Sequence, residues 1–208
     1  MSSSNIIIHR LEALSALYNQ ERLVINMKKN AILLNGPSSS GKSTLSIALQ
    51  KALEYETGEK YGILSIDDFL DMTINEPIYE EDVFEISPNL CKTAVNMVSS
   101  QKNIIIDHVI TSKRIFKQLI ETLEFCDLYL INVTCPLQEL IRREQQRKNR
   151  CSGSAEASFQ YLFPQEPYDL TIDTFQTPIE ECTLQIIKVL QNKPNAVYKV
   201  MNKIRSED

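Results

Sequence analysis

One eight-residue segment of the chain has the residue types and the spacing of a phosphate-binding loop. It runs Gly36-Pro37-Ser38-Ser39-Ser40-Gly41-Lys42-Ser43, fits the pattern G-x-x-x-x-G-K-[ST], and is followed by Thr44. Its glycines let the backbone wrap closely around phosphate oxygens, with successive N–H groups pointing inward. We expect Lys42 to bridge the β- and γ-phosphates and the Ser43 hydroxyl to bind Mg²⁺. The segment predicts a nucleoside triphosphate site; the alternative is a Gly/Ser turn that binds nothing.

Carboxylates stand at the ends of two other apolar segments. Asp67 and Asp68 follow one of them, and Asp107 and His108 end another. Either carboxylate position could bind Mg²⁺, directly or through water, or accept the proton of an acceptor hydroxyl. The alternative is that these aspartates only cap the elements that follow. We interpret His108 as a structural histidine with satisfied hydrogen bonds rather than a second base.

Three arginines are spaced so that a helix would bring them together. Arg143, Arg147 and Arg150 fall at positions i, i+4 and i+7, which share one helix face. Guanidinium groups gathered in this way repel one another unless anions arrive. We expect a mobile lid over about residues 142–158 that folds over the triphosphate and stabilises the transferring charge. An ordinary solvated basic helix is the alternative.

Short segments rich in aliphatic residues alternate with segments of helical spacing. The expected strands are Ala31–Asn35, Gly62–Ile66, Asn103–Asp107, Asp127–Val133 and Asp169–Asp173. The expected helices are Ser43–Leu53, Leu90–Val98, Ile115–Leu123, Leu137–Lys148 and Ile179–Leu190. This alternation predicts an α/β fold, a five-stranded parallel sheet with helices on both faces.

Two terminal segments lie outside the alternating series. Residues 1–29 are expected to form an N-terminal helical extension, with an amphipathic helix over about Asn5 to Val24. Residues 193–208 should contain a short final helix with apolar positions from Val197 to Ile204. The nucleotide-binding domain is therefore expected to span residues 30–192.

The composition excludes several classes of protein. The chain has 208 residues, with 22 Lys and Arg against 27 Asp and Glu, which gives a net charge of −5. A mildly acidic chain is a poor candidate for binding nucleic acid through its phosphates. No apolar run approaches the ~18 residues that a membrane helix needs.

The cysteines and the N-terminus favour a reducing compartment. Cys91, Cys126, Cys135, Cys151 and Cys182 are odd in number and never spaced as C-x-x-C. We interpret them as reduced thiols, and only two histidines are available for a zinc site. The first residues lack the pattern of a secretion signal. The expectation is a cytoplasmic protein.

Several of these segments together resemble one known family, chloramphenicol phosphotransferase. The resemblance lies in Leu33-Leu34-Asn35-Gly36 through Ser43, Ile66-Asp67, Ile104-Ile105-Ile106-Asp107, Arg143-Glu144-x-x-Arg147-x-Asn149-Arg150-x-x-Gly153, Tyr168-Asp169-x-x-x-Asp173-Thr174 and Glu180-Glu181-Cys182. It runs from about Asn30 to Leu190. The resemblance implies a P-loop fold of the nucleoside-kinase and shikimate-kinase type that phosphorylates a small-molecule hydroxyl with ATP and Mg²⁺.

The resemblance also assigns roles to individual residues. The catalytic aspartate that deprotonates the acceptor falls at Asp67, and the carboxylate of the third strand, a candidate Mg²⁺ ligand, falls at Asp107. The lid arginines fall at Arg143, Arg147 and Arg150. We expect the loop after Asp173-Thr174 to border the adenine and to face Arg143.

Three departures from the family pattern concern the acceptor side. The segment between Asp67 and Asp107 is shorter, His108 stands where the family has a second aspartate, and Phe163-Pro164-Gln165-Glu166-Pro167 replaces a histidine-containing stretch. The segment from Asp71 to Glu85 contains no Lys or Arg, although Lys113 and Arg114 could contribute from a later loop.

These features predict an ATP-dependent kinase whose acceptor is a neutral or cationic small molecule bearing a hydroxyl, because a phosphorylated acceptor needs basic side chains. An acidic, solvated loop that never contacts substrate would explain the composition of residues 71–85 equally well. Two other functions stay open. One is a metabolite or nucleotide-sugar kinase, shikimate-kinase-like or zeta-toxin-like. The other is a non-catalytic ATP-binding switch module.

Overall fold

The fold is known from a computed structural model that describes residues 28–70, 78–147 and 152–207. The expected N-terminal helix lies outside these residues. Five strands form one sheet in the order β2-β3-β1-β4-β5, and every neighbouring pair is parallel. Their bounds are β1 Asn30–Asn35, β2 Tyr61–Ser65, β3 Asn103–His108, β4 Asp127–Thr134 and β5 Leu170–Asp173. The predicted five-stranded parallel sheet is confirmed.

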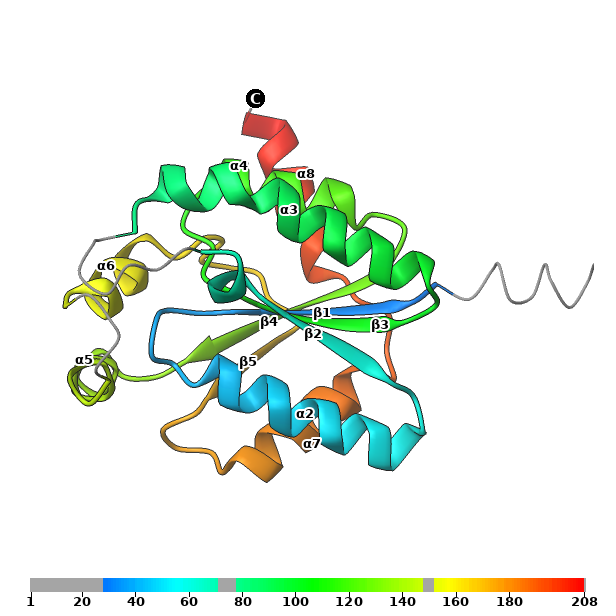
Figure 1. Ribbon diagram of the computed structural model, residues 1–208, viewed down its shortest axis with the longest axis horizontal. Helices are drawn as coiled ribbons and strands as arrows, with labels where there is room; N and C mark the ends of the chain where they lie inside the picture. Colours follow the sequence, from blue (N-terminus) through cyan, green and yellow to red (C-terminus); the bar gives the residue numbers. More distant parts are fainter. Residues whose placement is uncertain (1–27, 71–77, 148–151, 208) are drawn as a thin grey trace, which may run out of the picture.

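Helices cover both faces of the sheet (Figure 1). One face carries α3 Glu80–Ser99, α4 Lys113–Thr122 and α8 Ala196–Glu207, and the other carries α2 Lys42–Thr57 and α7 Ile179–Val189. Two short helices, α5 Leu137–Gln145 and α6 Ser154–Tyr161, lie beyond the carboxyl ends of the strands. A single 3₁₀ turn, η1, spans Ile66–Asp68 directly after β2. No helix in the described ranges is long and apolar enough to cross a bilayer.

Two hydrophobic clusters sandwich the central strands. Ile104 and Ile106 of β3 belong to the cluster under α3, α4 and α8, whereas Ile105 belongs to the cluster under α2 and α7. All three side chains are 0% exposed. Because side chains alternate along a strand, Asp107 continues the α2 side and His108 continues the α3 side. The end of β3 thus places Asp107 and His108 on opposite faces of the sheet.

Several helices differ from the prediction, α2 among them, which ends at Thr57 instead of Leu53. Helix α3 begins at Glu80, ten residues before the expected start at Leu90, and it contains Pro88. Its first turn is acidic, which complements the positive end of the helix dipole, and the N–H of Tyr79 donates to Asp82 at 2.7 Å. A prediction that depends on the spacing of apolar residues could not detect the polar first turn of α3. Helix α5 ends at Gln145 instead of Lys148, and α6 was not predicted.

The buried centre of the sheet should dominate the stability of the fold. Replacing Ile105, which is 0% exposed, by Ala should lower the free energy of unfolding by about 2–5 kcal/mol through lost burial and an unfilled cavity. The same change at Ile47, which is 51% exposed on α2, should stay within about 0.5 kcal/mol. Denaturant unfolding measures both values, and equal losses would contradict this account of the core.

Candidate active site

The phosphate-binding loop begins where β1 ends, and its backbone lies against β4. A Cβ atom at Gly36 would sit 2.1 Å from the carbonyl oxygen of Val133, so only glycine fits there. Gly41 has a φ of +93° and forms the N-cap of α2. Lys42 begins α2 and is 6% exposed, and its Nζ donates to the carbonyl of Pro37 at 2.9 Å. The loop thus ends at the N-terminus of α2, which is a favourable place for anions.

Three serine hydroxyls line this loop without protein partners. The Oγ atoms of Ser38, Ser39 and Ser40 are buried and make no hydrogen bond within the described part of the chain. Buried polar atoms are ordinarily paired, so their orphaned state fits a loop shaped for an oxygen-rich ligand. A polyphosphate supplies such oxygens. Thr44, the last residue expected at the phosphates, is exposed in the first turn of α2.

Ser43, in the first turn of α2, lies within hydrogen-bond distance of Asp107, near the end of β3. The Ser43 hydroxyl donates to Asp107 Oδ2 at 2.7 Å, and Asp107 is 4% exposed. A hydroxyl and a carboxylate oxygen are hard ligands of the kind that Mg²⁺ takes. Among the described residues no three His, Cys, Asp or Glu side chains cluster as a metal site. The pair therefore fits an ion that would complete its coordination with phosphate oxygens and water.

Asp67 lies between two cavities, whereas the adjacent residue Asp68 lines neither of them. A small cavity beside the phosphate-binding loop is lined by Lys42, Asp107 and Arg147 among others, and a larger one of about 420 Å³ adjoins it. Asp67 lines both cavities and is half-buried in η1. Asp68 is exposed and lines neither. The geometry therefore distinguishes two aspartates that the local residue pattern did not, and the one that faces the cavities is Asp67, to which the family resemblance assigns the catalytic role.

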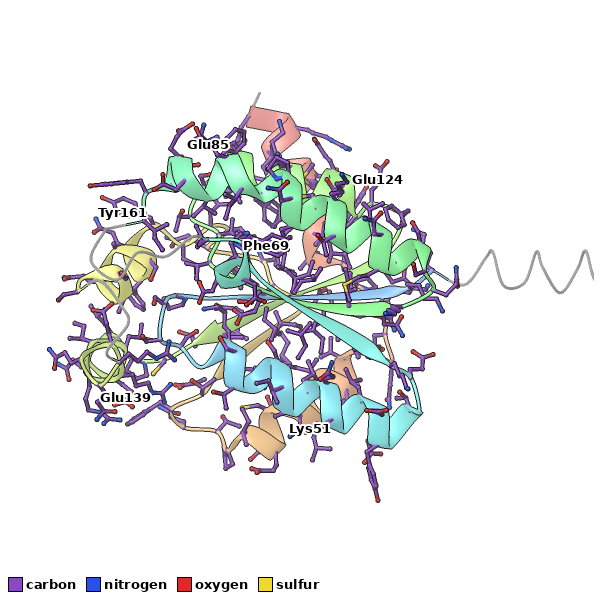
Figure 2. All side chains as sticks on the ribbon, viewed as in Figure 1. Lys51, Phe69, Glu85, Glu124, Glu139 and Tyr161 are labelled. Carbon is purple, nitrogen blue, oxygen red and sulfur yellow. The ribbon has the colours of Figure 1, made fainter. Side chains whose placement is uncertain are left out.

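The larger cavity has walls from two elements that are distant in sequence. Ile78, Tyr79, Glu80 and Val83, at the start of α3, form one wall, and Ser154, Ala157, Ser158 and Tyr161 of α6 form the other. Figure 2 shows Tyr161 on α6, close to the start of α3. The remaining lining residues are Ser38, Ile66, Asp67, Leu70, Val109 and Thr111. None of these lining residues is basic.

Lys113 and Arg114, the two basic residues that the sequence suggested for this cavity, have other partners. Arg114 donates to the carboxylates of Glu80 and Glu81, and its guanidinium lies 4.2 Å from the centre of the Phe84 ring. These hydrogen bonds from Arg114 lower the pKa of Glu80. Lys113 approaches Glu207 at 3.9 Å. The single cation of Arg114 is thus paired with two carboxylates at the start of α3 and forms no cationic patch there.

Arg143 is connected to the phosphate-binding loop through Thr174. Its Nε donates to Glu139 at 2.8 Å, and its Nη1 donates to Thr174 Oγ1 at 3.2 Å. Thr174 Oγ1 in turn donates to the carbonyl of Ser40 at 2.6 Å. Asp173 accepts the backbone N–H groups of Phe175 and Gln176, so its carboxylate shapes the loop after β5.

The expected single arginine face is wrong. Helix α5 ends at Gln145, and Arg147 lies beyond it in irregular chain, lining the small cavity. Arg150 lies outside the described residues. The physical reason is Glu144, 5% exposed, whose carboxylate accepts the N–H groups of Gly153 at 2.9 Å and Ala155 at 2.7 Å. A continuing helix would carry the chain away from these partners.

Two functional features were missed at the sequence level. Helix α6 forms a cavity wall, and the Oγ of Ser158 accepts the backbone N–H of Ser38 in the phosphate-binding loop at 2.8 Å. The helix-start signal Gly153-Ser154 could have revealed α6.

His108 is buried as expected of a structural residue, but within the described residues neither ring nitrogen has a hydrogen-bond partner. Burial lowers the pKa of His108 to about 4, which keeps the imidazole neutral.

Two named relatives are similar to most of the chain. The "Putative O-phosphotransferase Rv2636" of Mycobacterium tuberculosis is 25% identical over 190 residues, covering 78% of this chain and 83% of the relative. The adenylyl-sulfate kinase of Staphylococcus epidermidis is 27% identical over 187 residues, covering 85% and 92%.

Solved kinase structures share the fold. The APS kinase of Mycobacterium tuberculosis, in complex with AMPPNP and APS, superposes with a TM-score of 0.62 at 18% identity, covering 79% of this chain and 99% of the kinase. A gluconokinase from Sinorhizobium meliloti has a TM-score of 0.60 at 14% identity, covering 88% and 99%. The model of the family described as chloramphenicol phosphotransferase-like protein matches residues 29–191. The chain belongs to the chloramphenicol phosphotransferase-like family.

Proposed function

We propose that the protein transfers the γ-phosphate of ATP to a hydroxyl group of a small molecule that binds in the larger cavity. The observation that supports this most directly is the position of Asp67, which lines both that cavity and the one beside the phosphate-binding loop. A hydroxyl held at the junction would have a carboxylate on one side and the triphosphate on the other. Phosphoryl transfer depends mainly on such positioning and on charge stabilisation.

The proposed reaction is a direct, in-line displacement. The acceptor hydroxyl gives its proton to the Asp67 carboxylate, its oxygen forms a bond to the γ-phosphorus, and the bond to the leaving ADP oxygen breaks. Lys42, Arg143, Arg147 and Arg150 neutralise charge on the transferring group. Mg²⁺, when bound by Ser43 and Asp107, supplies further neutralisation of the phosphate oxygens.

The nucleotide is proposed to lie along the loop from Gly36 to Thr44. The adenine would border the loop after Asp173-Thr174, facing Arg143. In support, Thr174 contacts both Arg143 and the carbonyl of Ser40. We propose that Asp173 acts by holding this loop in shape, because its carboxylate accepts the N–H groups of Phe175 and Gln176.

The proposed acceptor is uncharged or cationic. Adenylyl sulfate, which the Staphylococcus epidermidis relative is named for, is an anion. An anionic acceptor needs basic side chains, and the described lining of the larger cavity contains none. Arg114, at the start of α4, is already bound to Glu80 and Glu81. Most of the lining is apolar or hydroxyl-bearing, which suits a neutral body of about the size that a 420 Å³ cavity admits.

The proposal is tested by ADP release from Mg·ATP, measured without acceptor and with pooled hydroxylated antibiotics and metabolites, chloramphenicol among them. Acceptor-dependent release, with label from radiolabelled ATP recovered on one component, is the expected result. Tight ATP binding with every pool silent would favour the non-catalytic switch module instead.

The base is tested by Asp67→Asn, with Asp68→Asn as the matched control. Asparagine cannot take the proton, so phosphotransfer should fall by about 100-fold or more, the usual contribution of a general base. ATP affinity should change little, because the amide keeps the shape of the side chain. Asp68→Asn should resemble the wild type. Unchanged turnover in Asp67→Asn with a large loss in Asp68→Asn would transfer the role to Asp68.

The nucleotide contact is tested by Thr174→Val, which removes a hydroxyl but keeps the shape. The variant loses the hydrogen bonds to Ser40 and Arg143, so ATP should bind about tenfold more weakly. Calorimetric titration with a non-hydrolysable ATP analogue measures the affinity. Thr171→Val, at an exposed position of β5, the strand that Thr174 follows, is the control. Equal affinities in the two variants would argue against a nucleotide site at Thr174.

A further inference from the structure

The side chain of Asn35 is a fully satisfied amide at the base of the site. Asn35 is the last residue of β1, precedes Gly36 of the phosphate-binding loop, and is 0% exposed. Its Oδ1 accepts the N–H of Ile110 at 3.0 Å, and its Nδ2 donates to the carbonyl of Phe163 at 2.9 Å and to Tyr168 Oη at 3.0 Å. Both donor hydrogens and the carbonyl oxygen are therefore in use.

The partners of this amide belong to the two segments that build the larger cavity. Ile110 lies between Val109 and Thr111, which line that cavity. Phe163 lies two residues beyond the end of α6, whose residues form the opposite wall. The two partner segments also bind one another, because the N–H of Phe163 donates to the carbonyl of Ile110 at 2.8 Å.

A second layer of contacts holds the segment after α6. Tyr168 Oη donates to the carbonyl of Pro164, and the rings of Phe163 and Phe116 meet edge to face with centroids 5.5 Å apart. Burial raises the pKa of Tyr168 well above its ordinary value, so its hydroxyl stays protonated and available as a donor. The amide of Asn35 is the part of this network that belongs to β1.

We propose that Asn35 is a positioning residue, which sets the place of the acceptor cavity relative to the phosphate-binding loop. This inference rests on the proposed function. Rotation or loss of the amide releases Ile110 on one side and Phe163 with Tyr168 on the other, so the α6 wall and the lining segment around Val109 and Thr111 can then shift against Gly36. Misplacement by about 1 Å of one reactant can slow a transfer about 100-fold. Water can then compete with the misplaced hydroxyl for the γ-phosphate.

The variant Asn35→Asp tests the inference with little change of shape. Aspartate keeps an acceptor for Ile110 but has no N–H for Phe163. In an assay with radiolabelled ATP and the pooled hydroxylated compounds, two quantities are measured: the pool concentration that half-saturates transfer, and the phosphate recovered on acceptor per ADP formed. The first should rise about tenfold and the second should fall by half or more, with the KM for ATP changed less than about threefold.

Asn103 provides a matched control at the other end of the sheet. It is 5% exposed at the start of β3, where its Oδ1 accepts the N–H of Asn30 at 2.9 Å and its Nδ2 donates to Glu59 at 2.6 Å. Asn103→Asp should lower the melting temperature, as Asn35→Asp does, without changing the phosphate recovered per ADP. Tyr168→Phe, which removes one partner of Asn35, should shift both measured quantities in the same direction but less.

The outcomes are distinct. If Asn35→Asp and Tyr168→Phe keep the wild-type half-saturation and the wild-type phosphate per ADP, or if Asn103→Asp changes them equally, the inference is overturned while the proposed function stands. If the wild-type protein transfers phosphate to no acceptor, the proposed function is overturned, and the inference with it.

Discussion

Parallel pairing on both sides of β1 brings the separate parts of the site to one edge of the sheet. In a parallel sheet the carboxyl ends of neighbouring strands lie together, and β1 has β3 on one side and β4 on the other. The register pairs Asn35 with His108, and β2 continues the pattern with Ser65 opposite Asp107. At the far side, Thr134 pairs with Asp173, directly before Thr174. Residues far apart in the chain therefore meet because their strands end at the same level.

The alternation of side chains then divides this edge into two compartments. Asp107 points to the side of α2, where it meets Ser43 at 2.7 Å. On the opposite side of the sheet, α3 and the segment around Val109 enclose the larger cavity. Asp67, in the turn after β2, lines the space on both sides of this division. A phosphate donor and an acceptor could thus be bound by different elements and still meet at one carboxylate.

Later parts of the chain complete the site by binding back to this strand edge. Glu144 ties the end of α5 to the start of α6, and Ser158 of α6 accepts the N–H of Ser38. Asn35 holds the segment that leaves α6. These contacts are buried polar groups, whose geometry is strict because an unpaired partner in the interior is costly. The α6 wall of the larger cavity is therefore anchored at both of its ends.

Local patterns in the sequence were sufficient for the phosphate-binding loop and for the sheet. Gly36, Gly41 and Lys42 fall at a spacing that depends only on backbone geometry near one helix N-terminus, and strands buried on both faces appear as continuous apolar runs such as Ile104-Ile105-Ile106. Which of Asp67 and Asp68 faces the cavities, where α5 ends, and which groups bind Arg114 and Asn35 were decided only by the tertiary structure. Each depends on a contact between residues distant in sequence, or on which side of an element faces a cavity, and no local spacing carries that information.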